Sequence, residues 1–178
     1  MEFVDEVAIE NSTASEARIA FLNLDLIVQA HPLLRTWRPV SSEIRGRCTC
    51  LHIELVDNIM GFDVVYQAEM IYDPQDPTGS IQFDSEAALS VKVSHTYSFR
   101  DALQAGALQP SSFPATAGAA IISDRVSVQY GWISFALKIF IDSTVRRATR
   151  AVLVNMRHII QQHRAAAAAS GLQDLTHS

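Results

Sequence analysis

One histidine interrupts the apolar side of a predicted β-strand, where an ionisable group could do chemistry. In "VKVSHTYSF", residues 91–99, alternation places His95 on the same side as Val91, Val93, Tyr97 and Phe99, because successive side chains of a strand point to opposite faces. An imidazole titrates near neutral pH, so it can accept or donate a proton there. His95 is therefore the first candidate for a catalytic residue.

A carboxylate interrupts the next predicted strand in the same way. In "IISDRVSVQY", residues 121–130, alternation groups Asp124 with Ile122, Val126, Val128 and Tyr130. Burial of a charged group among hydrophobic side chains is costly unless the group is paired. Asp124 is therefore expected to have a partner.

The two strands are consecutive and are expected to pair antiparallel. If residues near Arg100 and Ala119 face each other at the connecting loop, His95 lies opposite a position at or next to Asp124. A carboxylate that fixes one imidazole nitrogen leaves the other free to accept a proton, which would make His95 an oriented general base. Tyr97, on the same face, would donate a hydrogen bond. The alternatives are a buried pair that only stabilises the sheet, and a register shift that turns the set outward.

Large amphipathic side chains on the predicted strands are candidates for substrate binding. They are Trp37, Arg35, Tyr66, Met70, Tyr72 and Phe99. Tyr66, Met70 and Tyr72 share one face of a strand, so they would line one wall of an internal site. In the alternative interpretation each tyrosine is a packed core residue whose hydroxyl is satisfied at an edge, and Arg35 is solvated.

The composition favours one acidic globular domain. Of the 178 residues, 48% are hydrophobic, which is enough for one domain with a sizeable core. The net charge of -5 argues against a nucleic-acid partner, because such binding depends on Lys and Arg that neutralise phosphates. Cys48 and Cys50 would point to opposite faces of a strand, which predicts free thiols in a reducing compartment.

The sequence shows no signal for export, membrane insertion or a bound cofactor. The start "MEFVDEVAIE" is acidic and lacks the regions of a secretory signal, and no apolar run approaches the ~18 residues that span a bilayer. We find no glycine-rich phosphate loop, nucleophile elbow or cluster with metal-ligand spacing. We therefore expect a soluble, cytoplasmic protein with no cofactor and no metal.

Periodicity predicts one strand and two short helices, followed by a β-rich region. Thr13 and Glu16 fit a capping box, Asn23 or Asp25 would divide the helical segment, and Pro32 would end it. Strands are predicted near residues 3–10, 34–40, 49–56, 62–72, 80–85, 89–100 and 119–130. The long segment between the last two strands is expected to be a mobile loop at the entrance of the site.

The C-terminal part changes from strand to helix periodicity. From Trp132 to about Ala169, apolar residues recur at helical spacing, which predicts one long amphipathic helix with a basic side. We expect a single domain of residues 1–169 and a flexible tail of residues 170–178.

This order of elements resembles the helix-grip fold of the START-like and birch-pollen-allergen-like superfamily, which includes polyketide cyclases and dehydratases. The resemblance covers nearly the whole chain, from "FVDEVAIENSTASEARIAFLNL" through "HPLLRTWRPVSS" to "SDRVSVQYGWISFALKIFIDSTVRRATRAVLVNMRHII". It implies an α+β fold in which a seven-stranded antiparallel sheet wraps a long C-terminal helix and encloses an apolar cavity. It also implies binding of lipids, polyketides or hormones, with cyclisation, dehydration or aromatisation in some members.

Three functions remain open at this point. The first is a cofactor-independent cyclase or isomerase that acts on a hydrophobic polyketide- or terpenoid-like intermediate by an aldol-type, dehydrative or pericyclic ring formation. The second is a non-catalytic carrier of a lipid or secondary metabolite, and the third is an interaction module that uses the basic helix face. The expected partner is a small hydrophobic ligand, without nucleic acid or stable membrane insertion, and a homodimer is left open.

Overall fold

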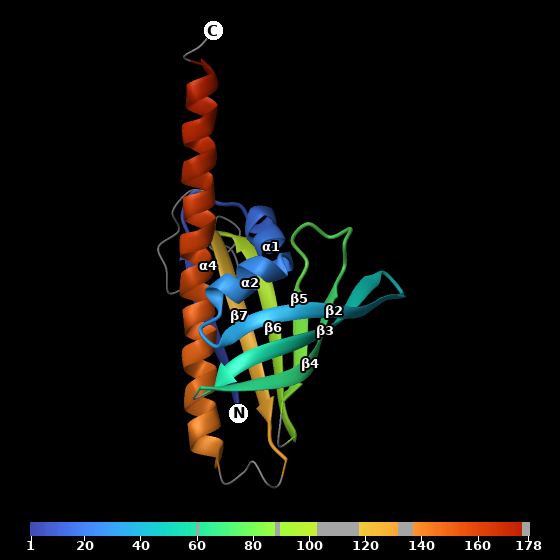
Figure 1. The fold of residues 1–178 in the computed structure, drawn as a ribbon. Coiled ribbons are helices and arrows are strands. Elements are labelled where there is room, and N and C mark those ends of the chain that lie inside the picture. The colour runs from blue at the N-terminus through green and yellow to red at the C-terminus, as the bar shows by residue number, and fades with distance from the viewer. Residues whose placement is uncertain (60, 88–89, 103–117, 132–136, 176–178) are drawn as a thin grey trace.

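The computed structural model describes residues 1–59, 61–87, 90–102, 118–131 and 137–175, with side chains through residue 168. The strands are β1 (Glu2–Ile9), β2 (Leu34–Arg45), β3 (Cys48–Ile59), β4 (Phe62–Tyr72), β5 (Ile81–Ala87), β6 (Val91–Asp101) and β7 (Ala120–Gln129). The helices are α1 (Ala14–Leu22), α2 (Leu24–Ala30) and α4 (Lys138–Leu175). This order of elements is the predicted one (Figure 1).

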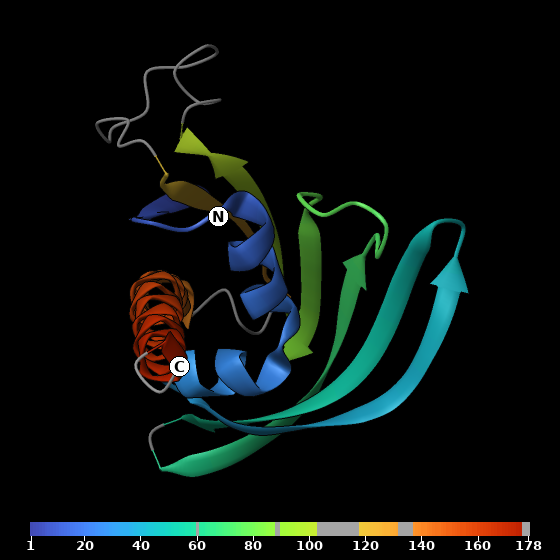
Figure 2. The same cartoon turned by 90° about the horizontal axis from the view of Figure 1, so that it is seen from above.

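The strands form one antiparallel sheet in the order β1-β7-β6-β5-β4-β3-β2. The sheet is strongly curved, and Figure 2, viewed from above, shows it bent around a space that α4 borders on one side. The short helices α1 and α2 lie over one end of this space. The arrangement confirms the predicted α+β helix-grip fold with a seven-stranded antiparallel sheet.

Local hydrogen bonds explain where the short helices begin and end. The Thr13 hydroxyl accepts the backbone N–H of Glu16 at 3.2 Å, and the Glu16 carboxylate accepts the backbone N–H of Thr13 at 2.8 Å, which confirms the capping box. Asn23 ends α1 and also caps α2, since its side chain accepts the backbone N–H of Asp25 at 3.1 Å. One asparagine therefore divides the helical segment in two.

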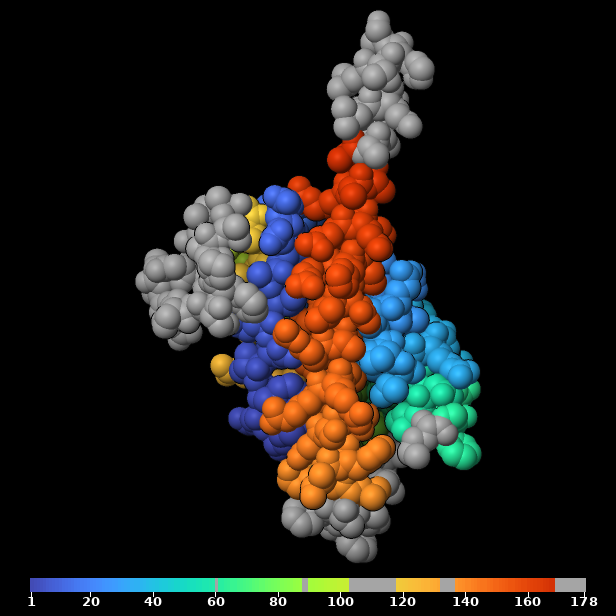
Figure 3. Space-filling view, turned by 90° about the vertical axis from the view of Figure 1, so that its left-hand side faces the viewer, coloured from blue at the N-terminus to red at the C-terminus, as the bar shows by residue number. Residues whose placement is uncertain are grey.

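The long helix α4 supplies the middle of the hydrophobic core. Val152, Leu153 and Met156 are at most 3% exposed, and they contribute to the same core as Phe21 and Ile53. Figure 3 shows α4 lying along the molecule between β1 on one side and α2 on the other. The helix therefore packs between the first strand and the second short helix.

Arginines on α4 attach this helix to neighbouring elements. Arg150 donates to the Asp5 carboxylate of β1 at 2.7 Å, and Arg164 donates to the Glu16 carboxylate of α1 at 2.7 Å. Part of the predicted basic face is thus occupied by intramolecular ion pairs. This observation weakens the hypothesis that the face binds an acidic partner.

The element boundaries differ from the predicted ones mainly by strand length. β2 continues to Arg45, where a tight turn with Gly46 at φ +66° joins it to β3, and β3 continues to Ile59, which pairs with Phe62 of β4. Residues 132–136 and 103–117 lie outside the described residues, so the start of the helix at Trp132 and the entrance loop stay predictions. The domain of residues 1–169 and the flexible tail also stay predictions. Within the described part of the chain, no helix is both long and apolar enough for a membrane crossing.

Truncation of Met156 to alanine is expected to lower the free energy of unfolding by about 2–5 kcal/mol, because the side chain is fully buried under the sheet. Chemical denaturation monitored by circular dichroism measures this change. Ile139→Ala, at a position on the same helix that is 87% exposed, is the matched control and should change stability by no more than about 0.5 kcal/mol. Equal losses in both variants would contradict the placement of α4.

Candidate functional site

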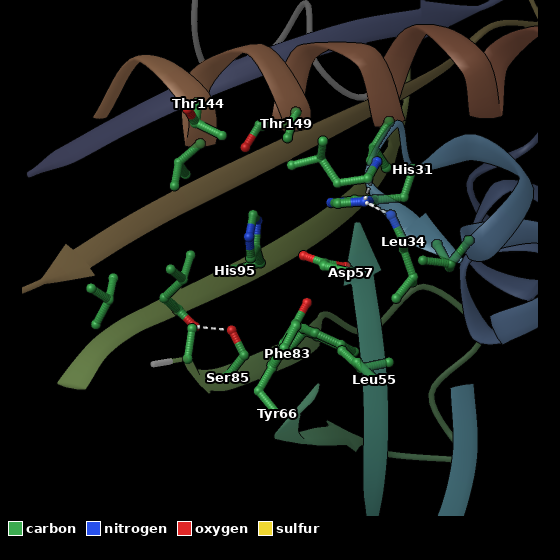
Figure 4. Close-up of a pocket in the computed structure, with 18 of the residues that line it drawn as sticks. His31, Leu34, Leu55, Asp57, Tyr66, Phe83, Ser85, His95, Thr144 and Thr149 are labelled. Atoms are coloured by element: carbon green, nitrogen blue, oxygen red, sulfur yellow. Dashed lines mark hydrogen bonds between the residues drawn. The ribbon is translucent and has the colours of Figure 1, made fainter. Parts of the chain in front are cut away.

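A cavity of about 320 Å³ lies between the concave face of the sheet and the N-terminal half of α4. Aliphatic and aromatic side chains from β3 to β6, α1, α2 and α4 form most of its wall. Leu137 and Phe140, both wall residues near the start of α4, are 49% and 48% exposed, so the cavity opens to the surface there. A small number of polar groups interrupts this apolar wall (Figure 4).

The predicted contact between His95 and Asp124 is present. His95 Nδ1 lies 2.8 Å from Asp124 Oδ2, and the side chains are 17% and 1% exposed respectively. In the register of β6 and β7, Asp124 is opposite Tyr97 while His95 is opposite Val126. The pair is therefore a diagonal pair on one face of the sheet, within reach of long side chains.

The contact with Asp124 determines which nitrogen of His95 carries the proton and which one can accept a proton. Asp124 accepts only hydrogen bonds when it is ionised, so the proton between the two groups belongs to His95 Nδ1. The lone pair of a neutral His95 then lies on Nε2, and His95 is a wall residue of the cavity. Asp124 Oδ1 is buried and has no hydrogen-bond partner among the described residues. The geometry is that of an oriented base.

Two tyrosines of the cavity wall are held in their protonated form. Burial raises the pKa of Tyr97 well above its ordinary value, and the Asp124 carboxylate raises it further. Burial also raises the pKa of Tyr66, with an added contribution from Asp57. The Tyr97 ring is nearly parallel to the His95 ring, with centroids 5.8 Å apart. Both phenols therefore keep a proton to donate at neutral pH, Tyr97 to a ligand oxygen and Tyr66 either to Asp57 or to a ligand oxygen in its place.

A second carboxylate, which the sequence interpretation missed, belongs to the same cavity. Asp57 on β3 is 7% exposed, and its Oδ1 atom has no hydrogen-bond partner within the described part of the chain. Burial raises its pKa, while the nearby Tyr66 hydroxyl acts in the opposite direction. The alternation of Leu51, Ile53 and Leu55 leads directly to Asp57 and could have identified it, but the predicted strand stops at residue 56.

A second imidazole also lines the cavity. His31 Nδ1 accepts the backbone N–H of Leu34 at 2.9 Å and that of Leu33 at 3.3 Å. An acceptor at Nδ1 leaves the proton on Nε2. Burial lowers the pKa of His31 to about 4, with a contribution from the positive charge of His95. His31 is therefore a neutral donor at physiological pH, whereas the sequence pattern indicates only a residue that ends a helix.

Some of the predicted substrate-binding residues line the cavity, and the others lie on the surface or in the core. Tyr66 and Met70 line the cavity, as does the predicted donor Tyr97. Arg35 lies on the surface with its side chain 60% exposed and 3.7 Å from the Asp63 carboxylate. The structure does not place Arg35 on the cavity wall.

The three remaining predicted binding residues pack around the core instead of lining the cavity. The Trp37 indole donates to the Asp25 carboxylate at 2.8 Å. Phe99 is 6% exposed and packs edge-on against Phe21 of α1, with centroids 5.5 Å apart. Tyr72, at the end of β4, is a half-buried neighbour of the same core. α1 covers the sheet at Phe99, so the cavity does not extend to that position.

One group of potential metal ligands occurs among the described residues, on the outer face of the sheet. Glu43, His52 and Glu69 place their ligand atoms within 4.8 Å of one another. Arg45 forms ion pairs with both carboxylates, and its distance to Glu69 is 2.9 Å. Because Arg45 already supplies the positive charge, the group is explained as an ion-pair network.

Comparisons with known proteins give similarity at the level of structure. No protein-family model and no curated protein sequence matches the chain. The TTHA0849 protein from Thermus thermophilus is similar with a TM-score of 0.66 and 13% identity, over 92% of this chain and 99% of that one. The Zhui aromatase/cyclase from Streptomyces sp. R1128 is similar with a TM-score of 0.65 and 11% identity, over 94% and 97%. Ara h 8.0201 is similar with a TM-score of 0.61 and 12% identity, over 91% of this chain and 98% of that one. At these identities the likeness shows the fold, and the chain has the helix-grip fold of these proteins.

The partly buried position of His31 on the cavity wall, which lowers its pKa, predicts a loss of stability in mild acid. Below about pH 6.5 the unfolded chain binds a proton at His31 that the folded protein excludes, so stability is lost as pH falls from about 6.5 towards 4. His31→Asn keeps an acceptor close to the position of Nδ1 but does not titrate. We expect the wild type to lose on the order of 2 kcal/mol more than this variant between pH 7 and 4.

Urea denaturation at a series of pH values measures this difference. Asp57 and His95 share the cavity with His31 and are unchanged in the variant, so the comparison isolates the contribution of His31. His158→Asn, at an exposed position of α4, should follow the wild-type curve. Parallel curves for the wild type and His31→Asn would show that His31 is not buried in a neutral form.

Replacement of Asp57 by asparagine is expected to stabilise the protein at pH 7 by about 1 kcal/mol, because a buried carboxylate with one unpartnered oxygen is removed. The folded-state pKa of Asp57 is raised, so the stability from its neutral form is present below about pH 4 and lost as pH rises through the folded value. The advantage of the variant should therefore shrink in acid. Thermal unfolding at both pH values tests this, with Asp63→Asn at an exposed position as the control. Destabilisation at pH 7 would contradict it.

Proposed function

We propose that the protein is a cofactor-independent cyclase or isomerase that acts on a hydrophobic, polyketide- or terpenoid-like intermediate enclosed in the cavity. The observation that carries this proposal is the 2.8 Å contact between the buried Asp124 carboxylate and Nδ1 of His95, which lies on the largely apolar cavity wall. Similarity to the fold of an aromatase/cyclase supports the same class of reaction. His95, Tyr66 and Tyr97 line the cavity, and Asp124 lies behind His95 as its hydrogen-bond partner.

Proton abstraction would be the first step of an aldol-type ring closure. His95 Nε2 takes a proton from a carbon next to a substrate carbonyl, the electron pair of that C–H bond forms a C=C bond, and the π pair of the carbonyl moves onto its oxygen to give an enolate. The Asp124 carboxylate stabilises the resulting imidazolium. A phenol from Tyr97 or Tyr66 donates a hydrogen bond to the enolate oxygen, where negative charge develops.

Carbon–carbon bond formation would follow within the same enclosed molecule. The enolate carbon bonds to a second carbonyl carbon of the substrate, and the π electrons of that carbonyl become the lone pair of an alkoxide. The alkoxide takes the proton from the His95 imidazolium, so the base is restored and no oxidant is required. For dehydration, His95 removes a further proton from carbon and passes that same proton to the departing hydroxyl, which leaves as water while the C–H electron pair forms the new C=C bond.

The apolar wall would contribute through the conformation of the substrate. A flexible chain that is folded against aliphatic and aromatic side chains has its reacting carbons close together, and this lowers the entropic part of the barrier. A pericyclic ring closure would need only this shape and one polarising donor. In that case Tyr66 or Tyr97 would matter more than His95.

The second candidate is a non-catalytic carrier for a lipid or secondary metabolite. The large apolar share of the cavity wall favours it, because such a wall binds hydrophobic ligands without any chemistry. In a carrier the contact between His95 and Asp124 would only satisfy two buried groups. The two candidates differ in whether a bound ketone loses its proton faster than a free one.

Exchange of the α-protons of 2-tetralone in D₂O, followed by NMR, tests the base directly. This hydrophobic ketone contains acidic C–H bonds next to a carbonyl and needs no other reactant. We expect the wild type to accelerate exchange over the buffer rate. His95→Gln should lower the catalysed rate on the order of 10²–10⁴-fold, and Asp124→Asn should cause a similar or smaller loss.

His52→Gln is the matched control, because it makes the same substitution on the outer face of the sheet, beside Glu69. It should exchange at the wild-type rate. Saturable binding of 2-tetralone without any acceleration would favour the carrier. If Tyr97→Phe lowers the rate while His95→Gln does not, catalysis by a donor and not by a base is indicated.

A further inference from the structure

The base mechanism leaves one buried charge without a role. Asp57 lies on β3, three strands away from His95 in the order of the sheet. Its side chain is buried, with the residue 7% exposed, and its Oδ1 atom has no hydrogen-bond partner among the described residues. A buried polar atom of this kind destabilises the fold unless a ligand satisfies it.

The backbone holds His31 and Asp57 at the same end of the cavity. In the pairing of β2 and β3, Asp57 is opposite Leu34, whose N–H is bound by the His31 ring. The backbone N–H of Asn58 donates to the carbonyl oxygen of Leu33 at 2.8 Å. Figure 4 shows His31 and Asp57 on neighbouring parts of the wall, with Tyr66 on the side of Asp57. Their positions are therefore set by the hydrogen bonds of the sheet.

The two groups offer complementary hydrogen-bonding functions. His31 has its Nδ1 atom occupied by the backbone, so its free function is the Nε2–H donor. Asp57 offers the acceptor Oδ1. A ligand group that satisfies both must accept one hydrogen bond and donate another.

Most polar groups of small molecules fail this requirement. An ammonium group has only donors, so it would leave the N–H of His31 unpaired. A ketone oxygen has only acceptors and leaves Asp57 unpaired, and a ligand carboxylate would be repelled by Asp57. A hydroxyl combines a donor and an acceptor on one oxygen atom, which matches the pair.

We propose that Asp57 and His31 form a hydroxyl-recognition site, so that the hydrophobic ligand carries an alcohol, phenol or enol group at this end of the cavity. The ligand hydroxyl donates to Asp57 Oδ1 and accepts from His31 Nε2–H. This site deepens the proposed function, since it depends on the cavity binding a ligand, but it does not depend on catalysis by His95. It orients the ligand relative to the base on β6.

Binding of two probes of the same shape tests the site. Fluorescence titrations with 2-naphthol and 2-methylnaphthalene at pH 7 give a ratio of dissociation constants for each protein variant. Comparison of these ratios between variants removes the difference in hydration of the two probes. Asp57→Leu is expected to lower the preference for 2-naphthol about tenfold or more, because a hydrogen bond to a charged acceptor is lost.

His31→Asn should also reduce the preference, since it retains the acceptor for the backbone but removes the donor at Nε2. Asp63→Leu, at an exposed carboxylate of β4, should leave the ratio unchanged. His52→Gln, on the outer face of the sheet, should likewise keep the wild-type preference. Measured affinity of Asp57→Leu for 2-methylnaphthalene, which should equal or exceed that of the wild type, verifies that the variant is folded.

The possible failures can be separated. If both probes bind the wild type and the ratio is the same in Asp57→Leu, the hydroxyl site is wrong while the ligand cavity stands. A preference that is lost in His95→Gln and kept in Asp57→Leu would assign hydroxyl recognition to the base, which also overturns the site. If neither probe binds the wild type, both the ligand cavity and the hydroxyl site are refuted.

Discussion

A single helix cannot cover the concave face of seven curved strands, and this mismatch creates the cavity. α4 packs chiefly against α2 and β1, which lie at the borders of the curved sheet. The inner faces of β3 to β6 are therefore left to be filled by side chains or by a ligand, since protein interiors are otherwise close-packed. Pairing of β1 with β7 fixes the first residues beside the last strand and so keeps α4 at one side of this space. The cavity therefore follows from the order of the strands and the position of α4, and it does not depend on a small side chain at any one position.

The polar groups in this space have little value for stability. Three buried side-chain oxygens on or beside the cavity wall, those of Asp57, Asp124 and Thr149, lack hydrogen-bond partners among the described residues. Each such atom costs stability, because its interactions with water are lost on folding. Sequences that depart from good packing usually do so at functional sites. The concentration of these atoms around one apolar space is therefore the best structural reason to regard the space as a site.

Alternation along strands predicted the fold and the contact between His95 and Asp124, but it did not predict the roles of Asp57 and His31. His95 and Asp124 were identified because a charged group on an apolar face is visible in a single strand, and because consecutive strands pair. Asp57 was missed because the predicted strand ended one residue before it, whereas pairing with β4 extends β3 to Ile59. The direction of the His31 ring depends on backbone amides beyond the helix end. Arg35 lies at a register shift in β2, where an irregular strand re-aims its side chains and simple alternation fails.

The irregularity of β2 has a further consequence for the solubility of the folded chain. β2 is an edge strand, and an edge presents unpaired backbone groups that can recruit another chain. Its register shifts at residues 34–36 and 39–41 interrupt a flat ladder, and Pro39 has no N–H to donate. Arg38 adds a charged side chain that is bound to Glu54 on the neighbouring strand. These features oppose edge-to-edge growth, so a continuous intermolecular sheet built on β2 would be unfavourable.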